Sequence, residues 1–104
     1  MKPTELLVTE NEWEIIQKIL NSHLGAQQVF VFGSRAGGKP KKFSDLDLLV
    51  KDFLAIAPDK LAILSEEFLE SDLPYKVDLV LSSEISDSFK KIIEEKSILI
   101  LPAP

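Results

Sequence analysis

Three aspartates stand in apolar surroundings, where charged side chains are costly. Asp45 and Asp47 flank Leu46 within the run "SDLDLLV", and Asp78 lies within "YKVDLVL" further along the chain. A carboxylate that is taken out of water needs a partner that offsets its lost hydration. Carboxylates that lie close together repel and raise one another's pKa unless a cation neutralises them. Ligation by oxygen alone favours a hard ion, so this pattern indicates Mg²⁺ or Mn²⁺.

The stretch before the first two aspartates has the composition of a phosphate-binding turn. Gly33 and Ser34 directly follow the run "QVFVF". A glycine at the end of a strand lets the backbone approach a ligand, because it has no Cβ. A serine hydroxyl and the free N–H groups at the start of a helix form an anion site, and Arg35 can hold a phosphate through two hydrogen bonds. We therefore expect Gly33, Ser34 and Arg35 to bind phosphate.

Basic side chains gather just after this turn. Arg35, Lys39, Lys41 and Lys42 place four of the twelve basic residues within eight positions, in a chain whose net charge is −5. This concentration favours a polyphosphate ligand that is held locally; the alternative is a solvated loop whose lysines touch no ligand. Divalent ions beside a polyphosphate would bridge its phosphates and organise an in-line phosphoryl displacement.

Helical and strand patterns alternate along the chain. The spacing predicts helices from Thr9 to about Leu24, from Pro58 to before Pro74 and around 89–93, a short helix or turn at 34–39, and strands at 28–32, 44–50, 75–81 and 97–101. Such alternation predicts an α/β fold with helices packed on a small sheet, while strand order and direction stay open. The strand at 28–32 is typical of one covered on both faces.

The alternation of side chains along a strand determines where the carboxylates point. In the strand at 44–50, Asp45 and Asp47 project from one side, about 7 Å apart, while residues 46, 48 and 50 point into the core. In the strand at 75–81, residues 77, 79 and 81 would face the core and Asp78 the opposite side. If the two strands are neighbours, Asp78 joins Asp45 and Asp47.

Composition excludes several classes of function. The 104 residues, 45% apolar and 28% charged, predict one globular domain over residues 1–104. Without cysteine and with one histidine, neither a disulfide framework nor a structural zinc site is expected. The acidic balance argues against an extended nucleic-acid surface. No stretch has the length of a signal peptide core or of a membrane span, so a cytoplasmic location without membrane contact is expected.

The site motif resembles that of a known superfamily. "GS", ten further residues, "DLD" and a third aspartate in "VDLV" are similar to the nucleotidyltransferases that include DNA polymerase β and kanamycin nucleotidyltransferase. The likeness is greatest to the short prokaryotic minimal nucleotidyltransferases, and it runs from about Val29 to Leu101.

The resemblance implies a fold, a reaction and a role for each residue. The fold would be the α/β (α+β) nucleotidyltransferase fold, a small mixed sheet of about four strands with packed helices. Asp45 and Asp47 would bind two Mg²⁺ or Mn²⁺ ions, and Asp78 would bind one and share in activating the acceptor. Gly33 and Ser34 would hold the β- and γ-phosphates. The reaction would transfer a nucleoside monophosphate, AMP from ATP in most members, to a hydroxyl group and release pyrophosphate.

The resemblance also implies a partner. Larger members carry a helical domain for the acceptor, and minimal members are often paired with a separate helical protein of the HEPN or substrate-binding type, sometimes as toxin and antitoxin. A second copy of the chain is the other way to complete the cleft. Two alternatives to catalysis are an antitoxin-type subunit that neutralises a HEPN toxin and a catalytically dead relic; the intact aspartates speak against the relic.

Overall fold

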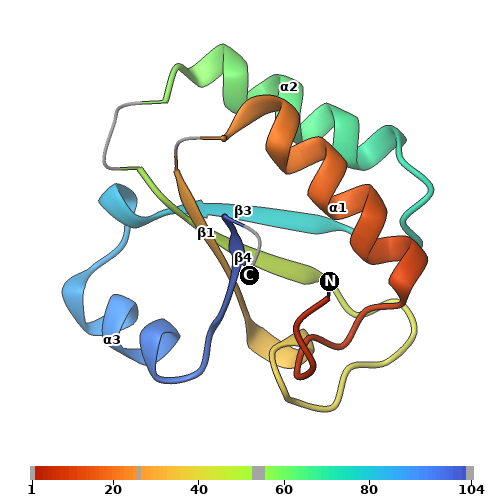
Figure 1. The fold of residues 1–104 in the computed structure, drawn as a ribbon. Helices are drawn as coiled ribbons and strands as arrows, with labels where there is room; N and C mark the ends of the chain where they lie inside the picture. The colour runs from red at the N-terminus through yellow and green to blue at the C-terminus, as the bar shows by residue number, and fades with distance from the viewer. Residues whose placement is uncertain (1, 26, 53–55, 103–104) are drawn as a thin grey trace.

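The computed structural model describes residues 2–25, 27–52 and 56–102, which form a sheet with helices packed against it (Figure 1). In chain order the elements are α1 (Glu10–His23), β1 (Gln28–Phe32), the 3₁₀ turn η1 (Gly33–Arg35), β2 (Leu46–Lys51), α2 (Pro58–Glu70), β3 (Val77–Leu81), the 3₁₀ turn η2 (Ser82–Glu84), α3 (Asp87–Glu95) and β4 (Ile98–Leu101). The predicted alternation of helices and strands is confirmed, and η2 is an addition to it.

The sheet is mixed, with the strand order β3-β2-β1-β4. β1 runs antiparallel to β2 and to β4, whereas β2 and β3 are parallel. A parallel pair needs a long crossover connection, and α2 lies in it. The strands that carry Asp47 and Asp78 are therefore neighbours, and these two residues are opposite each other in the register.

The helices begin where local chemistry allows. The Thr9 hydroxyl accepts a hydrogen bond from the Glu12 N–H, and the Glu12 carboxylate accepts one from the Thr9 N–H, which confirms the predicted capping box. Pro58 occupies the first turn of α2, where its missing N–H costs nothing. Within the described ranges, no helix is both long and apolar enough to cross a bilayer.

One face of the sheet is buried beneath α1 and α2 (Figure 1). Val29 and Val31 of β1 and Leu46, Leu48 and Val50 of β2 are completely buried there. The two helices contribute large side chains to the same core: Trp13, Ile16, Leu20, Leu64 and Phe68. The predicted core face of β2 is confirmed.

The opposite face of the sheet, called the open face below, is covered only in part. Phe30 and Phe32 of β1 are half-buried, and Phe89 of α3 meets the Phe32 ring edge-on, with ring centres 6.4 Å apart. The prediction that β1 is covered on both faces is wrong, because two helices cover one face and α3 reaches only part of the other.

Two strands begin later than the sequence predicts. β2 starts at Leu46 and β3 at Val77. Asp45 therefore belongs to the loop that leads into β2, and Tyr75 and Lys76 belong to the loop before β3.

Candidate active site

Asp45, Asp47 and Asp78 lie at one end of the central strands. Asp47 is the second residue of β2, and it pairs in the register with Asp78 on β3 and with Phe32, the last residue of β1. Its strand neighbours Leu46 and Leu48 point into the core, so Asp47 points to the open face. Asp45 is exposed at the end of the preceding loop. The structure thus brings the three predicted carboxylates to one place, with Asp45 supplied by a loop and not by a strand.

The carboxylates influence one another's charge. Partial burial raises the pKa of Asp47 above its ordinary value, and the negative charges of Asp78 and then Asp45 raise it further. Each of the two neighbours is therefore near enough to disfavour a negative charge on Asp47. A cation bound among the three would remove this repulsion.

Gly33 lies directly against Asp47. Its φ of +76° belongs to the left-handed region that favours glycine. A Cβ at this position would lie 2.5 Å from Oδ2 of Asp47, which is closer than two such atoms approach. Glycine is therefore favoured here both by the backbone conformation and by the carboxylate, and the glycine turn lies directly beside the acidic group.

Ser34 sits in a compact turn. The Gly38 N–H donates a hydrogen bond of 2.9 Å to the Ser34 carbonyl, and a Cβ at Gly38 would lie 2.8 Å from that oxygen. The helix that the sequence allows at 34–39 is a 3₁₀ turn of only three residues. Any anion contact here would rest on the Ser34 hydroxyl and nearby N–H groups, without the dipole of a longer helix.

Arg35 does not lie where the sequence predicts a phosphate ligand. Its side chain is buried, with 5% exposed. Nε donates a hydrogen bond of 2.9 Å to the Ser44 carbonyl, and one terminal nitrogen donates a hydrogen bond of 2.9 Å to the Leu7 carbonyl. The other terminal nitrogen donates to the carbonyls of Lys41 and Lys42, at 3.2 Å each. The guanidinium is committed to backbone carbonyls, so Arg35 positions η1 against the N-terminal segment and the loop that precedes β2.

Tyr75 completes this arrangement. Its ring centre is 3.9 Å from the Arg35 guanidinium carbon, and its hydroxyl donates to a Glu12 carboxylate oxygen at 3.0 Å. Burial and the bond to Glu12 raise the pKa of Tyr75 above its ordinary value. Sequence reasoning missed this role because Tyr75 and Glu12 lie 63 positions apart.

The lysines near the turn remain in solvent. Lys39, Lys41 and Lys42 are exposed in the loop between η1 and β2, and Lys42 Nζ lies 5.4 Å from the ring centre of Phe43, which is itself 66% exposed. This loop connects the glycine turn to Asp45 along the chain.

A hollow of about 520 Å³ adjoins Gly33. Phe32, Phe89, Ile92 and Ile93 supply its apolar walls. Glu95 and Lys96 line the rest of it, so the hollow beside the turn has both apolar and charged walls.

Comparison with known proteins identifies the family. The family described as "Polymerase beta, Nucleotidyltransferase" matches residues 14–103. The chain belongs to this family. It is therefore a nucleotidyltransferase, as the motif "GS", "DLD" and "VDLV" predicts.

Individual nucleotidyltransferases show how far the similarity extends. A probable protein adenylyltransferase, MntA of Haemophilus influenzae, is 40% identical over 101 residues, which cover 92% of this chain and 84% of that protein. The protein adenylyltransferase MntA of Thermococcus cleftensis is 34% identical over 94 residues, covering 84% and 94% respectively. The crystal structure of a toxin-antitoxin with AMP-PNP superposes with a TM-score of 0.68 at 23% identity, covering 84% of this chain and 70% of that one.

The acidic site of this nucleotidyltransferase has the oxygen ligands that a hard ion prefers, but its side chains do not converge on a single point. Among residues 2–25, 27–52 and 56–102, no three His, Cys, Asp or Glu side chains converge tightly enough to hold an ion as they stand. Asp78 pairs instead with Lys76, at 3.4 Å from Oδ1 to Nζ. The donor set nevertheless fits Mg²⁺ or Mn²⁺, because it consists of carboxylates that repel one another.

Proposed function

We propose that this nucleotidyltransferase transfers AMP from ATP to a hydroxyl group of a partner protein and releases pyrophosphate, with Mg²⁺ or Mn²⁺ as its cofactor. The observation that carries the proposal is the contact of Gly33 with Asp47, which itself lies opposite Asp78. A turn suited to phosphate and a set of carboxylates suited to a metal thereby meet at one point. The names of the similar MntA proteins support a protein as the acceptor and adenylate as the group transferred.

The proposal gives each residue a role. Asp45 and Asp47 would hold two ions and Asp78 one of them, while Gly33 and Ser34 would bind the β- and γ-phosphates. When bound, the ions supply charge neutralisation for the phosphates and for the attacking and leaving oxygens. The hollow lined by Phe32 would receive the nucleoside.

The reaction conserves atoms and charge in a single displacement. The acceptor oxygen forms a bond to the α-phosphorus, the bond from that phosphorus to the bridging oxygen breaks, and pyrophosphate leaves. The proton of the acceptor hydroxyl passes to Asp78 and then to solvent. Positioning of the two reactants supplies much of the catalysis in such transfers.

The partner that best fits the proposal is a helical protein of the HEPN type. Asp45 is exposed, and the Asp78 side chain retains 40% of its exposure, so the site as described does not exclude water by itself. A second chain would complete the cleft. The similarity in fold to a chain of a toxin-antitoxin complex supports this view. It also supports the second candidate, an antitoxin-type subunit whose binding alone neutralises a toxin.

Calorimetric titration with ATP and Mg²⁺ tests the proposed site. Asp45→Asn with Asp47→Asn should abolish metal-dependent ATP binding, whereas the matched pair Asp59→Asn with Asp72→Asn, both on exposed positions of α2 or just after it, should not. Mass spectrometry of the co-expressed partner should show added AMP only with the intact site. Unchanged ATP affinity in the first pair would overturn the assignment, and a partner that is neutralised equally well by the inactive pair would establish binding as the function.

A further inference from the structure

β3 ends the sheet on one side, and part of its backbone points outward. The Leu46 N–H donates to the Lys76 carbonyl at 2.9 Å. Backbone groups alternate in direction along a parallel pair. The backbone N–H and C=O groups of residues 76, 78 and 80 therefore point to β2, and those of residues 77, 79 and 81 point to the outer edge. This edge presents the donors and acceptors that a further strand would need.

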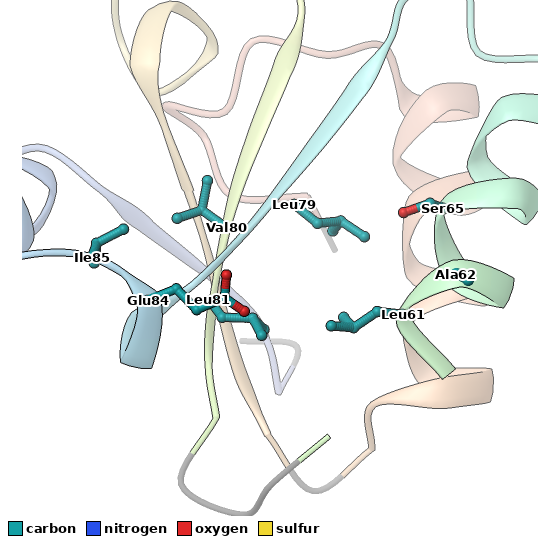
Figure 2. A pocket seen from close by; sticks show the side chains of 8 residues that line it. All are labelled: Leu61, Ala62, Ser65, Leu79, Val80, Leu81, Glu84 and Ile85. Carbon is teal, nitrogen blue, oxygen red and sulfur yellow. The ribbon is translucent and has the colours of Figure 1, made fainter. Parts of the chain in front are cut away.

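A groove follows this edge between β3 and α2. Two hollows, of about 430 and 620 Å³, share Ser65 and Leu79 in their walls. We call the combined surface the edge groove; its principal walls are Leu61, Ala62, Ser65 and Leu69 of α2 and Leu79 and Leu81 of β3. Figure 2 shows Leu79 and Leu81 directed toward α2. Leu69 is 81% exposed, so the groove offers apolar surface to a ligand.

The other edge of the sheet is protected. In the pairing of β4 with β1, the partner of Val29 is Leu101 and that of Phe30 is Leu99, so Ile100 is an extra residue in a bulge. The Ile100 carbonyl accepts a hydrogen bond of 2.8 Å from the Gln17 side chain. Bulges and covering side chains are the usual protection of exposed edges. The apolar β3 edge has a groove in place of such protection.

We propose that the edge groove binds an extended segment of the partner protein, which pairs with β3 as an additional strand and presents its acceptor hydroxyl to Asp78. The inference rests on the proposed function, since it supplies the acceptor for that reaction. Asp78 itself lines the groove. Adjacent strands lie about 4.8 Å apart, so a residue added beside Asp78 on the open face would stand next to it as Asp78 stands next to Asp47. A groove between an edge strand and a helix is a known setting for strand addition.

Charge determines which segment fits. Glu66 and Glu70 are exposed on α2, each directly after a groove residue, and Glu84 lines the far end. Lys76 also lines the groove, where its Nζ lies 3.4 Å from Oδ1 of Asp78. Among these residues the carboxylates outnumber the cation. A segment with alternating apolar side chains and basic flanks complements this acidic rim. A second copy of the chain would place its own acidic rim against the same rim of the first copy. Its Asp78 would also lie at the shared edge, close to the Asp78 of the first copy. The observations therefore favour a basic partner segment over a second copy.

The test uses the full chain and two synthetic peptides. Both alternate valine and threonine around a central tyrosine; one carries two lysines at each end, and the other carries two glutamates. Binding is followed by chemical shifts of the protein's backbone amides. The variant Ser65→Arg fills the groove from an exposed helical position, and Ser22→Arg makes the same change on the exposed surface of α1.

The lysine peptide should shift the outward amides of residues 77, 79 and 81 most strongly and bind more tightly than the glutamate peptide. Ser65→Arg should weaken its binding about tenfold or more, and Ser22→Arg less than about twofold. Absent binding, equal binding of the two peptides, equal binding to Ser65→Arg, or a dimer through β3 detected by light scattering would each overturn the inference.

Parallel measurements separate this inference from the proposed function. Ser65→Arg should keep the ATP affinity of the wild type and lose AMP transfer to the partner. If transfer to the partner persists in Ser65→Arg, the edge groove is not the acceptor site, although the proposed function stands. If the wild type binds the lysine peptide but not ATP with Mg²⁺, the proposed function fails, and with it the catalytic part of the inference.

Discussion

The two faces of the sheet differ in what they contribute to the fold and to the candidate site. Against α1 and α2, alternate residues of β1 and β2 are fully buried and entirely apolar. On the open face the intervening residues include Asp47 and Phe32, both half-buried. A single strand such as β2 therefore serves two purposes at once, because its side chains alternate between the faces.

Residues that stabilise the fold therefore alternate along β2 with a residue of the candidate site. Apolar burial supplies most of the free energy of folding. The helix-covered face has most of the buried apolar side chains, although Leu49 on the other side of β2 is also fully buried. The open face retains charges whose repulsion acts against folding. Substitutions on the two faces should thus change the free energy of unfolding by different amounts and in different directions.

The largest effect is expected on the covered face. Leu48→Ala removes a fully buried side chain from the core and should lower the free energy of unfolding by about 3 kcal/mol. Val80→Ala, a half-buried position in β3, should cost about 1 kcal/mol or less. Urea denaturation measures both. Equal losses would show that the open face contributes as much to the core as the covered face does.

An intermediate effect is expected at the glycine turn. Gly33 and Gly37 have φ of +76° and +89°, so replacing either by alanine should cost about 1–2 kcal/mol of backbone strain. Only at Gly33 would the new Cβ meet Asp47; at Gly37 nothing lies within 4 Å. Gly33→Ala should weaken binding of ATP with Mg²⁺ about tenfold or more, and Gly37→Ala less than about twofold.

Titration calorimetry of the two glycine variants decides whether the contact with Asp47 matters. If both variants lose ATP binding equally, backbone strain in the turn is the cause, and the closeness of the turn to the carboxylate is not.

The smallest effect, and one of opposite sign, is expected at Asp47. Since its pKa is raised in the folded chain, the folded state holds this proton more tightly than the unfolded state does. Stability is therefore lost as the pH rises through the raised pKa. Asp47→Asn removes that loss, so it should raise the melting temperature by a few degrees at pH 7. The difference should vanish below about pH 2.5, where the carboxyl is protonated in both states.

Thermal melts across this pH range measure the difference. Added Mg²⁺ should stabilise the wild type more than Asp47→Asn. A variant that is less stable than the wild type at pH 7 would show that the Asp47 carboxylate makes a net favourable contribution to the fold.

Local signals in the sequence predicted much of the fold. Thr9, Glu12 and Pro58 mark helix starts by chemistry that acts within one turn. Period-two alternation identified the core face of β2, and the spacing of Gly33 to Asp45 and Asp47 identified the family. The roles proposed for the three aspartates and for Ser34 stay predictions, although the structure brings the aspartates close to one another and Gly33 against Asp47.

Long-range contacts could not be predicted in this way. Arg35 follows Ser34 directly, so a phosphate contact was the natural expectation from the sequence. Its partners are carbonyls of Leu7 and of the loop before β2, and no local pattern specifies that these segments converge on it. The neighbouring placement of β2 and β3 likewise depends on tertiary packing, because α2 connects them and lies over the sheet, and a strand pattern does not determine that arrangement.

The bulge at Ile100 has a consequence for assembly. A sheet with two available edges can add strands at both, and such addition continues without limit, as in fibrils. Here Gln17 and the bulge close the β4 edge, which leaves β3 as the growing end. One strand from another molecule can pair with β3. If that strand is an isolated segment of a partner, it brings no further sheet with it, and the sheet grows no further. The asymmetry between the two edges would thus make association stop at a finite complex.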